Sequence, residues 1–152
     1  MARRRARELA FQALFQAERG GSPLREAWED LRLDLAAEAD EPPEPADVGF
    51  AADDLAFAAR LVHELESSKS AIDEQLAGLV EGWTFGQMAQ TDLNVMRLAL
   101  AELRLDETPP AVAVEMAVRL AKRFGGEDSG RFVNGVLAKA LRRHAAAEEV
   151  GT

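Results

Sequence analysis

The sequence lacks cysteine and tyrosine entirely, and it has only one isoleucine, four threonines and two histidines. Without cysteine the chain can form no disulfide framework, no thiol nucleophile and no cysteine-based zinc site. Isoleucine, threonine and tyrosine are residue types that favour strands, and no segment alternates convincingly between polar and apolar residues. The composition therefore argues against a β-sheet.

Long apolar runs are missing as well. No stretch approaches the roughly 20 apolar residues that a membrane span needs. Gln12 and Gln16 interrupt the N-terminal apolar segment, where a secretory signal requires continuity, and Glu8 and Glu18 argue against a transit peptide. At 152 residues the chain fits one domain with a substantial core. We expect a cytoplasmic protein that does not enter a membrane.

Residue combinations typical of catalytic or metal-binding sites are also scarce. His63 and His144 lie far apart, and His63 with Glu66 three residues later is typical of a surface pair on a helix. The adjacent acids at 53–54 and 148–149 lie in acidic stretches that favour solvated surfaces. No P-loop, dinucleotide-binding motif or G-x-S-x-G motif occurs. We therefore predict that the protein is not an enzyme, with no catalytic residue, no metal site and no cofactor.

Apolar residues recur with helical spacing along most of the chain, which predicts an all-α bundle of about seven helices. The predicted helices run from Arg3 to about Glu18, from Ser22 through Leu35, from near Phe50 through Leu65, from the interruption at Ser67-Ser68 through Ile72 to near Gly82, from a cap at Thr91 through Leu103, from a cap at Thr108 to Phe124, and from a cap at Asp128 or Ser129 through Leu141.

Three segments depart from the helical pattern. Residues 40–47 contain three prolines, which remove backbone donors and favour an extended linker. Residues 146–152 have the composition of a frayed tail. Gly135 stands inside the last predicted helix, where glycine costs about 1 kcal/mol relative to alanine. We expect close packing against a neighbouring helix to offset that cost.

Positive charge is concentrated at the N-terminus. The formal net charge is −9, but Arg3, Arg4, Arg5 and Arg7 contribute +4, so residues 8–152 sum to −13. The first turn of a helix disfavours a surface cation by about 0.3–1 kcal/mol, because its free N–H groups are already partly positive. A cluster there suits an anion, such as a phosphate, held by both the arginines and the helix terminus. The alternative is a solvated arm in a chain that prefers arginine to lysine by 15 to 3.

The remaining charges are also segregated. Residues 34–54 hold eight acids and no base, so this segment would repel nucleic acid. Basic residues recur in the C-terminal third, at Arg119, Lys122, Arg123, Arg131, Lys139, Arg142 and Arg143. Lys122 and Arg123 are explained equally well as cations that complement a helix C-terminus. Phe132, beside Arg131, fits either a core position, which its spacing from Val136 favours, or stacking on an unpaired base, worth about 1–3 kcal/mol.

Two segments resemble the NusB family of transcription antitermination factors. One is the opening Ala-Arg-Arg-Arg-Ala-Arg-Glu-Leu-Ala-Phe-Gln-Ala-Leu-Phe at 2–15. The other is Ala-Lys-Arg-Phe-Gly-Gly-Glu-Asp-Ser-Gly-Arg-Phe-Val-Asn-Gly-Val-Leu at 121–137. Between them, Trp83 and the segments 92–103 and 110–120 also match the pattern of that family. The resemblance covers most of the chain in the expected order.

The resemblance implies an N-terminal three-helix part packed on a C-terminal four-helix part. Residues 1–145 would form one domain with subparts of about 1–67 and 68–145. It also implies pairing with NusE, a small-subunit ribosomal protein, and joint binding of the single-stranded boxA element of nascent RNA. The resulting complex with RNA polymerase would support read-through of terminators, notably in ribosomal RNA operons. Self-association into a homodimer is a further implication.

Carried over residue by residue, the resemblance assigns RNA contacts to Arg3, Arg4, Arg5, Arg7, Asp128 and Phe132. It assigns contacts with NusE to Asp92 and, on weaker matches, to Phe15 and Arg97. Phe15 stands where the family often has tyrosine, so a hydroxyl contact would be lost.

Two other functions remain open at this point. A pure protein-interaction bundle could use the arginines against an acidic protein. A ribosomal RNA cytosine methyltransferase, to which NusB-like domains are sometimes fused, would need a cofactor-binding part for which this chain has no room.

Overall fold

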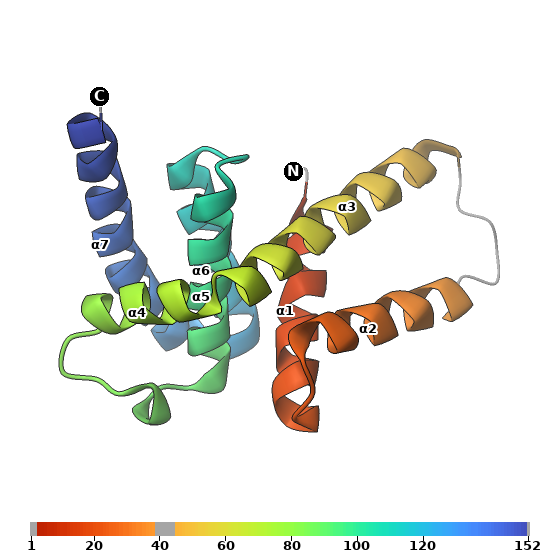
Figure 1. The fold of residues 1–152 in the computed structure, drawn as a ribbon, viewed down its shortest axis with the longest axis horizontal. Helices are drawn as coiled ribbons and strands as arrows, with labels where there is room; N and C mark the ends of the chain where they lie inside the picture. The colour runs from red at the N-terminus through yellow and green to blue at the C-terminus, as the bar shows by residue number, and fades with distance from the viewer. Residues whose placement is uncertain (1–2, 39–44, 152) are drawn as a thin grey trace. The chain divides into compact units, whose positions relative to one another are not determined.

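A computed structural model describes residues 3–38 and 45–151, which contain seven α-helices, one short 3-10 helix and no strand (Figure 1). The helices are α1 (Arg4–Gly20), α2 (Leu24–Glu38), α3 (Pro45–Ser67), α4 (Lys69–Leu79), η1 (Phe85–Gln87), α5 (Gln90–Leu105), α6 (Pro110–Gly125) and α7 (Glu127–Gly151). The prediction of an all-α protein with about seven helices is confirmed. Among the described residues, none of the helices combines the length and apolarity that a bilayer crossing requires.

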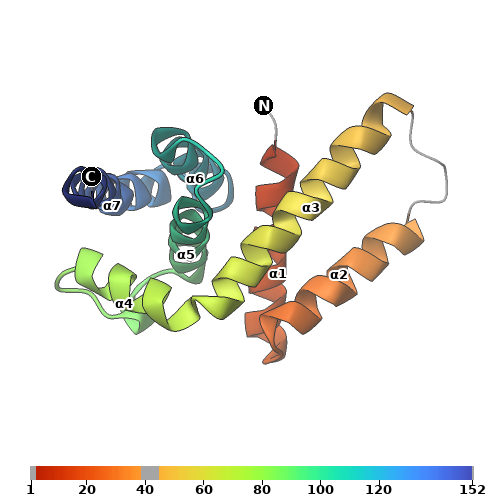
Figure 2. The same ribbon diagram turned by 45° about the horizontal axis from the view of Figure 1, so that its top comes forward.

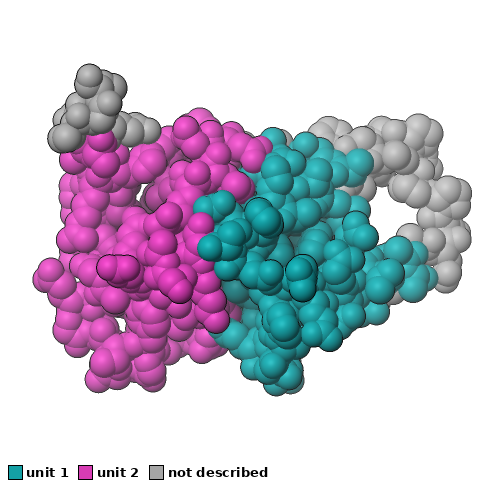
Figure 3. Space-filling view, in the orientation of Figure 1, with its two compact units in different colours: residues 1–67 teal, residues 68–152 magenta. Residues whose placement is uncertain are grey.

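The chain divides into two compact units, residues 1–67 and residues 68–152, which Figure 3 shows in different colours. Unit 1 contains α1, α2 and α3, and unit 2 contains α4, η1, α5, α6 and α7. The boundary falls between Ser67 and Ser68, where the helical pattern of the sequence is interrupted.

In unit 1, α1 packs against both α2 and α3 (Figure 2). Its buried face includes three alanines with no exposed surface, which let the neighbouring helices approach closely, and Phe57 and Leu61 of α3 are fully buried in the same core. Gly21 ends α1 in the left-handed conformation, at φ 63°, and its N–H bonds to the carbonyl of Ala17. This is the usual way for a glycine to satisfy the last carbonyls of a helix.

In unit 2, α5 is the central helix and contacts α4, α6 and α7. Between Asp92 and Leu103 every residue except Arg97 is buried, as expected for a helix surrounded by others. The helices α6 and α7 are joined by Gly126 alone, whose φ of 89° and ψ of −175° lie in a region that only glycine adopts readily. This tight turn fixes where α7 begins.

The predicted starts of α3 and α6 were wrong, and a proline explains each of them. The helix α3 begins at Pro45, within the segment 40–47 predicted to be extended, because a proline in the first turn loses no hydrogen bond. Residues 39–44 of that segment lie outside the described residues. Thr108 does not cap α6. Pro110 holds Pro109 in an extended conformation, with ψ at 132°, so the helix can begin only at Pro110.

Two other predicted caps also lie inside helices. The helix α5 begins at Gln90, with Ala89 rather than Thr91 at the capping position. The helix α7 begins immediately after Gly126, so Asp128 and Ser129 stand in its first turn, where acidic residues complement the helix dipole. At its other end α7 continues to Gly151, beyond the point where fraying was predicted to begin.

The environment of Gly135 also differs from the prediction. Beyond the backbone of its own helix and its chain neighbours, a Cβ atom added at this position would meet no heavy atom within 4 Å, so no neighbouring helix requires a glycine here. We expect Gly135→Ala to raise the free energy of unfolding by about 0.5–1 kcal/mol, because alanine loses less backbone entropy in a helix. Denaturant unfolding measures this change. Gly126→Ala should instead lower the free energy of unfolding. A less stable Gly135→Ala variant would contradict the open environment.

Candidate nucleic-acid interface

The arginine cluster, defined as Arg3, Arg4, Arg5 and Arg7, surrounds the N-terminus of α1. The first hydrogen bond of this end runs from the N–H of Arg7 to the carbonyl of Arg3, at 3.1 Å. No acidic residue stands in the first turn of α1. Arg4 and Arg5 are exposed and Arg3 is half-buried. The N–H groups of a first helical turn, which have no partner within the helix, and exposed guanidinium groups therefore occur together, which is the arrangement that binds a phosphate.

Arg7 differs from the other three because its side chain is buried, with 5% of the residue exposed. Its guanidinium carbon lies 5.8 Å from the centroid of the Phe57 ring, and that of Arg3 lies 4.2 Å from the same centroid. Both groups therefore have a cation–π partner within unit 1. We conclude that Arg7 contributes to the fold and to the local positive field, whereas Arg4 and Arg5 are the most accessible members of the cluster.

Arg60 on α3 extends this positive surface and was missed by the sequence analysis. Its guanidinium carbon lies 5.5 Å from the centroid of the Phe57 ring, so it approaches the same ring as Arg3 and Arg7. The spacing of three residues between Phe57 and Arg60 on one helix was a signal that could have suggested the contact. Its relation to the cluster depends on the packing of α1 against α3.

Carboxylates of unit 1 compete for the arginines. The Nε atom of Arg3 lies 3.8 Å from an oxygen of Asp53, and that of Arg4 lies 3.4 Å from an oxygen of Glu8. Each pair joins a more exposed side chain, Asp53 or Arg4, to a less accessible one, Arg3 or Glu8, and partly exposed pairs of this kind contribute about 0–1 kcal/mol. A phosphate oxygen can displace a carboxylate held that weakly.

Asp54 makes this surface sensitive to pH. Desolvation raises the pKa of its carboxyl above 3.8, the neighbouring charge of Asp53 raises it further, and Arg5 lowers it. A folded pKa above the unfolded value means that the ionised carboxylate destabilises the folded state, and this cost disappears as pH falls through the raised pKa. Protonation also removes a negative charge near Arg5.

We expect Asp53→Asn to raise the affinity for a polyanion about two- to fivefold at low salt, which corresponds to the strength of one exposed pair. The change removes the carboxylate that pairs with Arg3 and should also lower the pKa of Asp54. Fluorescence anisotropy with a labelled RNA measures the affinity. Asp34→Asn on α2 changes the net charge equally, so an equal gain in that variant would contradict a local effect.

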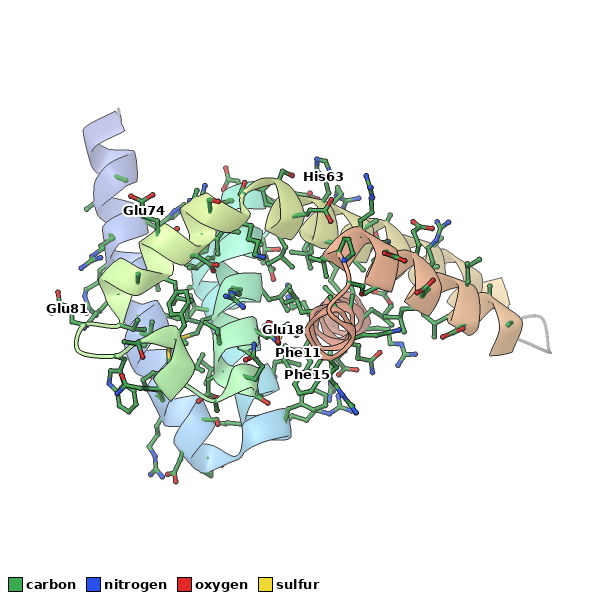
Figure 4. The ribbon with its side chains drawn as sticks, turned by 60° about the horizontal axis from the view of Figure 1, so that its bottom comes forward. Phe11, Phe15, Glu18, His63, Glu74 and Glu81 are labelled. Atoms are coloured by element: carbon green, nitrogen blue, oxygen red, sulfur yellow. The ribbon has the colours of Figure 1, made fainter. Side chains whose placement is uncertain are left out.

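Phe15, a predicted partner residue, is half-buried on α1. Its ring centroid lies 5.8 Å from that of the buried Phe11, with the ring planes at 48°, and Figure 4 shows the two rings on the same side of the helix. Phe11 therefore anchors the ring of Phe15 and leaves part of it accessible.

Asp92 and Arg97, the other predicted partner residues, both lie on α5 in unit 2. Asp92 is 8% exposed, and its Oδ1 atom has no hydrogen-bond partner among the described residues. Arg97 donates from Nε and Nη2 to the two oxygens of Asp73, at 2.9 and 3.3 Å, and its guanidinium carbon lies 5.6 Å from the centroid of the Phe85 ring. Arg97 therefore ties α5 to α4. For both residues, contact with a partner stays a prediction.

The two predicted RNA contacts of unit 2 lie in the first turns of α7. Asp128 is exposed and forms an ion pair with Arg131. Phe132 is half-buried, and its ring centroid lies 5.7 Å from that of Trp83, with the ring planes at 59°. The fully buried Val133 supplies the core contact at this level of α7. Phe132 therefore supports another aromatic ring and also presents part of its own surface.

Glycines let α6 and α7 approach closely beside these residues. A Cβ atom at Gly130 would overlap the side chain of Lys122, and one at Gly125 would overlap Ser129. The stem of Lys122 thus lies over the first turn of α7, and the glycines of segment 125–130 are required by packing and by the turn at Gly126. The motif that carries the family resemblance is in part a structural motif.

The comparisons with known proteins agree on one family. The profile of the NusB family matches residues 4–142. The transcription antitermination protein NusB of Thermus thermophilus is 46% identical over 146 residues, which is 96% of this chain and 94% of that protein. The structure of T. maritima NusB is similar with a TM-score of 0.77 and 31% identity, over 100% of this chain and 99% of that one.

The chain is also similar to one chain of a protein–RNA complex. A structure of the antitermination factors NusB and NusE in complex with double-stranded RNA contains a chain with a TM-score of 0.74 and 24% identity, over 93% of this chain and 96% of that one. At this identity the likeness shows that the fold is shared.

Proposed function

Because the chain belongs to the NusB family, we propose that it acts as a transcription antitermination factor that binds boxA-type single-stranded RNA together with the ribosomal protein NusE. The observation that carries the RNA part is the arginine cluster, in which exposed guanidinium groups surround a helix N-terminus without acids in its first turn. Asp128 and Phe132 in unit 2 are the further RNA-binding residues of the proposal.

In the proposed mechanism, charged side chains contact phosphates and an aromatic side chain contacts a base. Arginines at the start of α1 bind phosphates, and an aromatic ring on α7 stacks on a splayed base, which a single strand permits. Each phosphate neutralised on a single strand contributes about −0.7 to the slope of log affinity against log salt, so contacts by the exposed Arg4 and Arg5 give about −1.4. So few contacts give modest affinity, and a partner with contacts of its own raises both affinity and specificity.

NusE is the proposed partner for two reasons. Outside the first seven residues this chain has a formal charge of −13, which complements a basic ribosomal protein. A protein of the same fold has also been solved together with NusE and RNA. We propose that Asp92, Phe15 and Arg97 face NusE, and that the complex joins RNA polymerase and supports read-through, notably in ribosomal RNA operons.

We also propose the remaining properties that the family resemblance implies. The protein would act without catalysis and without a cofactor, as an adaptor in the cytoplasm. A homodimer in the free protein would compete with these partners, and sedimentation of the protein with and without NusE tests for it.

A gel-shift titration with boxA RNA across a salt series, with NusE present and absent, tests the proposed function. We expect salt-dependent binding by the chain alone and a large gain in affinity when NusE is added. Binding of NusE without any effect on RNA would instead support a pure protein-interaction bundle, and the RNA part of the proposal would be wrong.

A further inference from the structure

The turn between α4 and α5 holds a tryptophan that the proposed function has not used. Gly82 adopts a φ of 84°, and the N–H of Trp83 then bonds to the carbonyl of Val80 at 3.0 Å. On the other side the N–H of Thr84 bonds to the side chain of Gln87 at 2.9 Å. Figure 4 labels Glu81 in the same turn. Hydrogen bonds on both sides of Trp83 hold its backbone in place.

The two tryptophans of the chain are treated differently by the fold. Trp28 is buried in unit 1, whereas Trp83 is 52% exposed. An exposed indole leaves a large apolar surface in water, which does nothing for folding stability. Among the described residues, only Leu33 and Phe124 are other large apolar side chains with comparable exposure.

Phe132 orients the exposed indole. The two ring planes are tilted by 59° at a centroid distance of 5.7 Å, which is a favourable geometry for an aromatic pair. A ring held by a fixed backbone and by a second ring loses little freedom when a ligand binds, so less of the binding energy is spent on ordering it.

We propose that Trp83 is a base-stacking residue, whose exposed indole receives an unpaired nucleobase of the RNA while Phe132 holds the indole in position. The inference rests on the proposed function, because it names a further contact of the same RNA. It adds a binding residue on the α4–α5 turn to those that the family resemblance assigns.

The charges around Trp83 favour a base over a phosphate as its ligand. Residues 81–90 contain no cation, and Glu81 is an exposed anion two residues before the indole. Phosphate contacts would instead come from basic residues such as Arg131, which is exposed next to Phe132. Stacking uses the face of the base, so it contributes affinity without neutralising a phosphate.

Because the proposed contact of Trp83 is with a base and not with a phosphate, a variant at this position should change the affinity for RNA but not its salt dependence. We expect Trp83→Ala to weaken binding of a labelled boxA-type RNA by about fivefold or more, from the usual strength of base–aromatic stacking. The slope of log affinity against log salt should stay the same, because no phosphate contact is lost. Trp83→Phe should keep most of the affinity, whereas Trp83→Leu, which is apolar without a π-face, should lose it.

Leu33→Ala on α2 is the matched control, since it also removes an exposed apolar side chain. It should leave RNA affinity unchanged, and thermal unfolding should show that each variant remains folded. Equal RNA affinity for wild type and Trp83→Ala would overturn the inference. So would a variant that loses affinity for NusE but not for RNA, because Trp83 would then be a protein contact.

Fluorescence observes the stacking directly. In a Trp28→Phe background Trp83 is the only tryptophan, so its emission reports its own surroundings. We expect single-stranded RNA to quench this emission and to protect the indole from acrylamide, in parallel with the anisotropy of the labelled RNA. Binding seen by anisotropy without any change at Trp83 would overturn the inference and leave the proposed function intact. No binding of any RNA, even with NusE, would overturn both.

Discussion

Replacing Arg4 and Arg5 with alanine is expected to reduce the salt dependence of RNA binding by about 1.4 in the slope of log affinity against log salt. Each lost phosphate contact removes about 0.7 from that slope on a single strand. The loss of affinity should therefore be greatest at low salt. Anisotropy titrations from 50 to about 300 mM salt measure both quantities, and helicity should remain nearly unchanged because both side chains are exposed.

The control for this variant is Arg25→Ala with Arg32→Ala on α2, which makes the same change in net charge within unit 1. These two arginines are exposed and lie outside the arginine cluster. Their removal should leave the slope close to the wild-type value. A similar decrease in both double variants would mean that net charge, rather than the start of α1, controls RNA binding.

Arg3 and Arg7 are less suitable for this test because their side chains also pack within unit 1. Both guanidinium groups approach the ring of Phe57, and Arg7 is almost entirely buried. Removing a buried arginine loses packing as well as charge. A quadruple variant would therefore combine lost phosphate contacts with lost stability, whereas the exposed pair separates them.

Phe132→Ala is expected to affect both RNA affinity and stability. Truncating a buried phenylalanine costs about 3–5 kcal/mol, and for this half-buried ring we expect about 2 kcal/mol. That corresponds to a decrease in Tm of about 4–8 °C for a chain of this size. Affinity for RNA should fall by about 5- to 150-fold, the equivalent of one lost stacking contact. Calorimetry and anisotropy on the same variant measure the two effects.

Phe132→Leu separates the two roles of the ring. Leucine keeps an apolar side chain against Trp83 and so should retain most of the stability, but it offers no π-face to a base. A variant with nearly normal Tm and clearly weakened RNA binding fits the proposed role. If Phe132→Leu binds RNA normally, Phe132 acts only through packing.

The helices could be predicted from the sequence because their apolar periodicity is local. The ends were less predictable, because they depend on single backbone conformations. Pro110 excludes Thr108 as a cap by acting on Pro109, and the left-handed Gly126 moves the start of α7 ahead of Asp128. The cost of a glycine inside a helix suggested close packing at Gly135, but the positions of neighbouring helices are not local information, and the space beside it is open.

The positions of the charges in the candidate site could be predicted from the sequence, but the contacts between its side chains could not. The position of Arg4 and Arg5 at a helix start follows from the order of residues. The burial of Arg7 depends on Phe57, which is far along the chain and reaches α1 only through the packing of α3. The pairing of Trp83 with Phe132 likewise joins a turn to a distant helix. Such tertiary contacts decide which of several plausible residues remain accessible to a ligand.

Photo-crosslinking with boxA RNA that carries 4-thiouridine, in the presence of NusE, tests most directly where this chain holds RNA. Mass spectrometry of the crosslinked peptides identifies the residues that lie against the strand. We expect crosslinks to peptides from the start of α1 and to those that contain Trp83 or Phe132. Crosslinks confined to the acidic helix α2, with none at the arginine cluster or at the Trp83–Phe132 pair, would contradict this expectation.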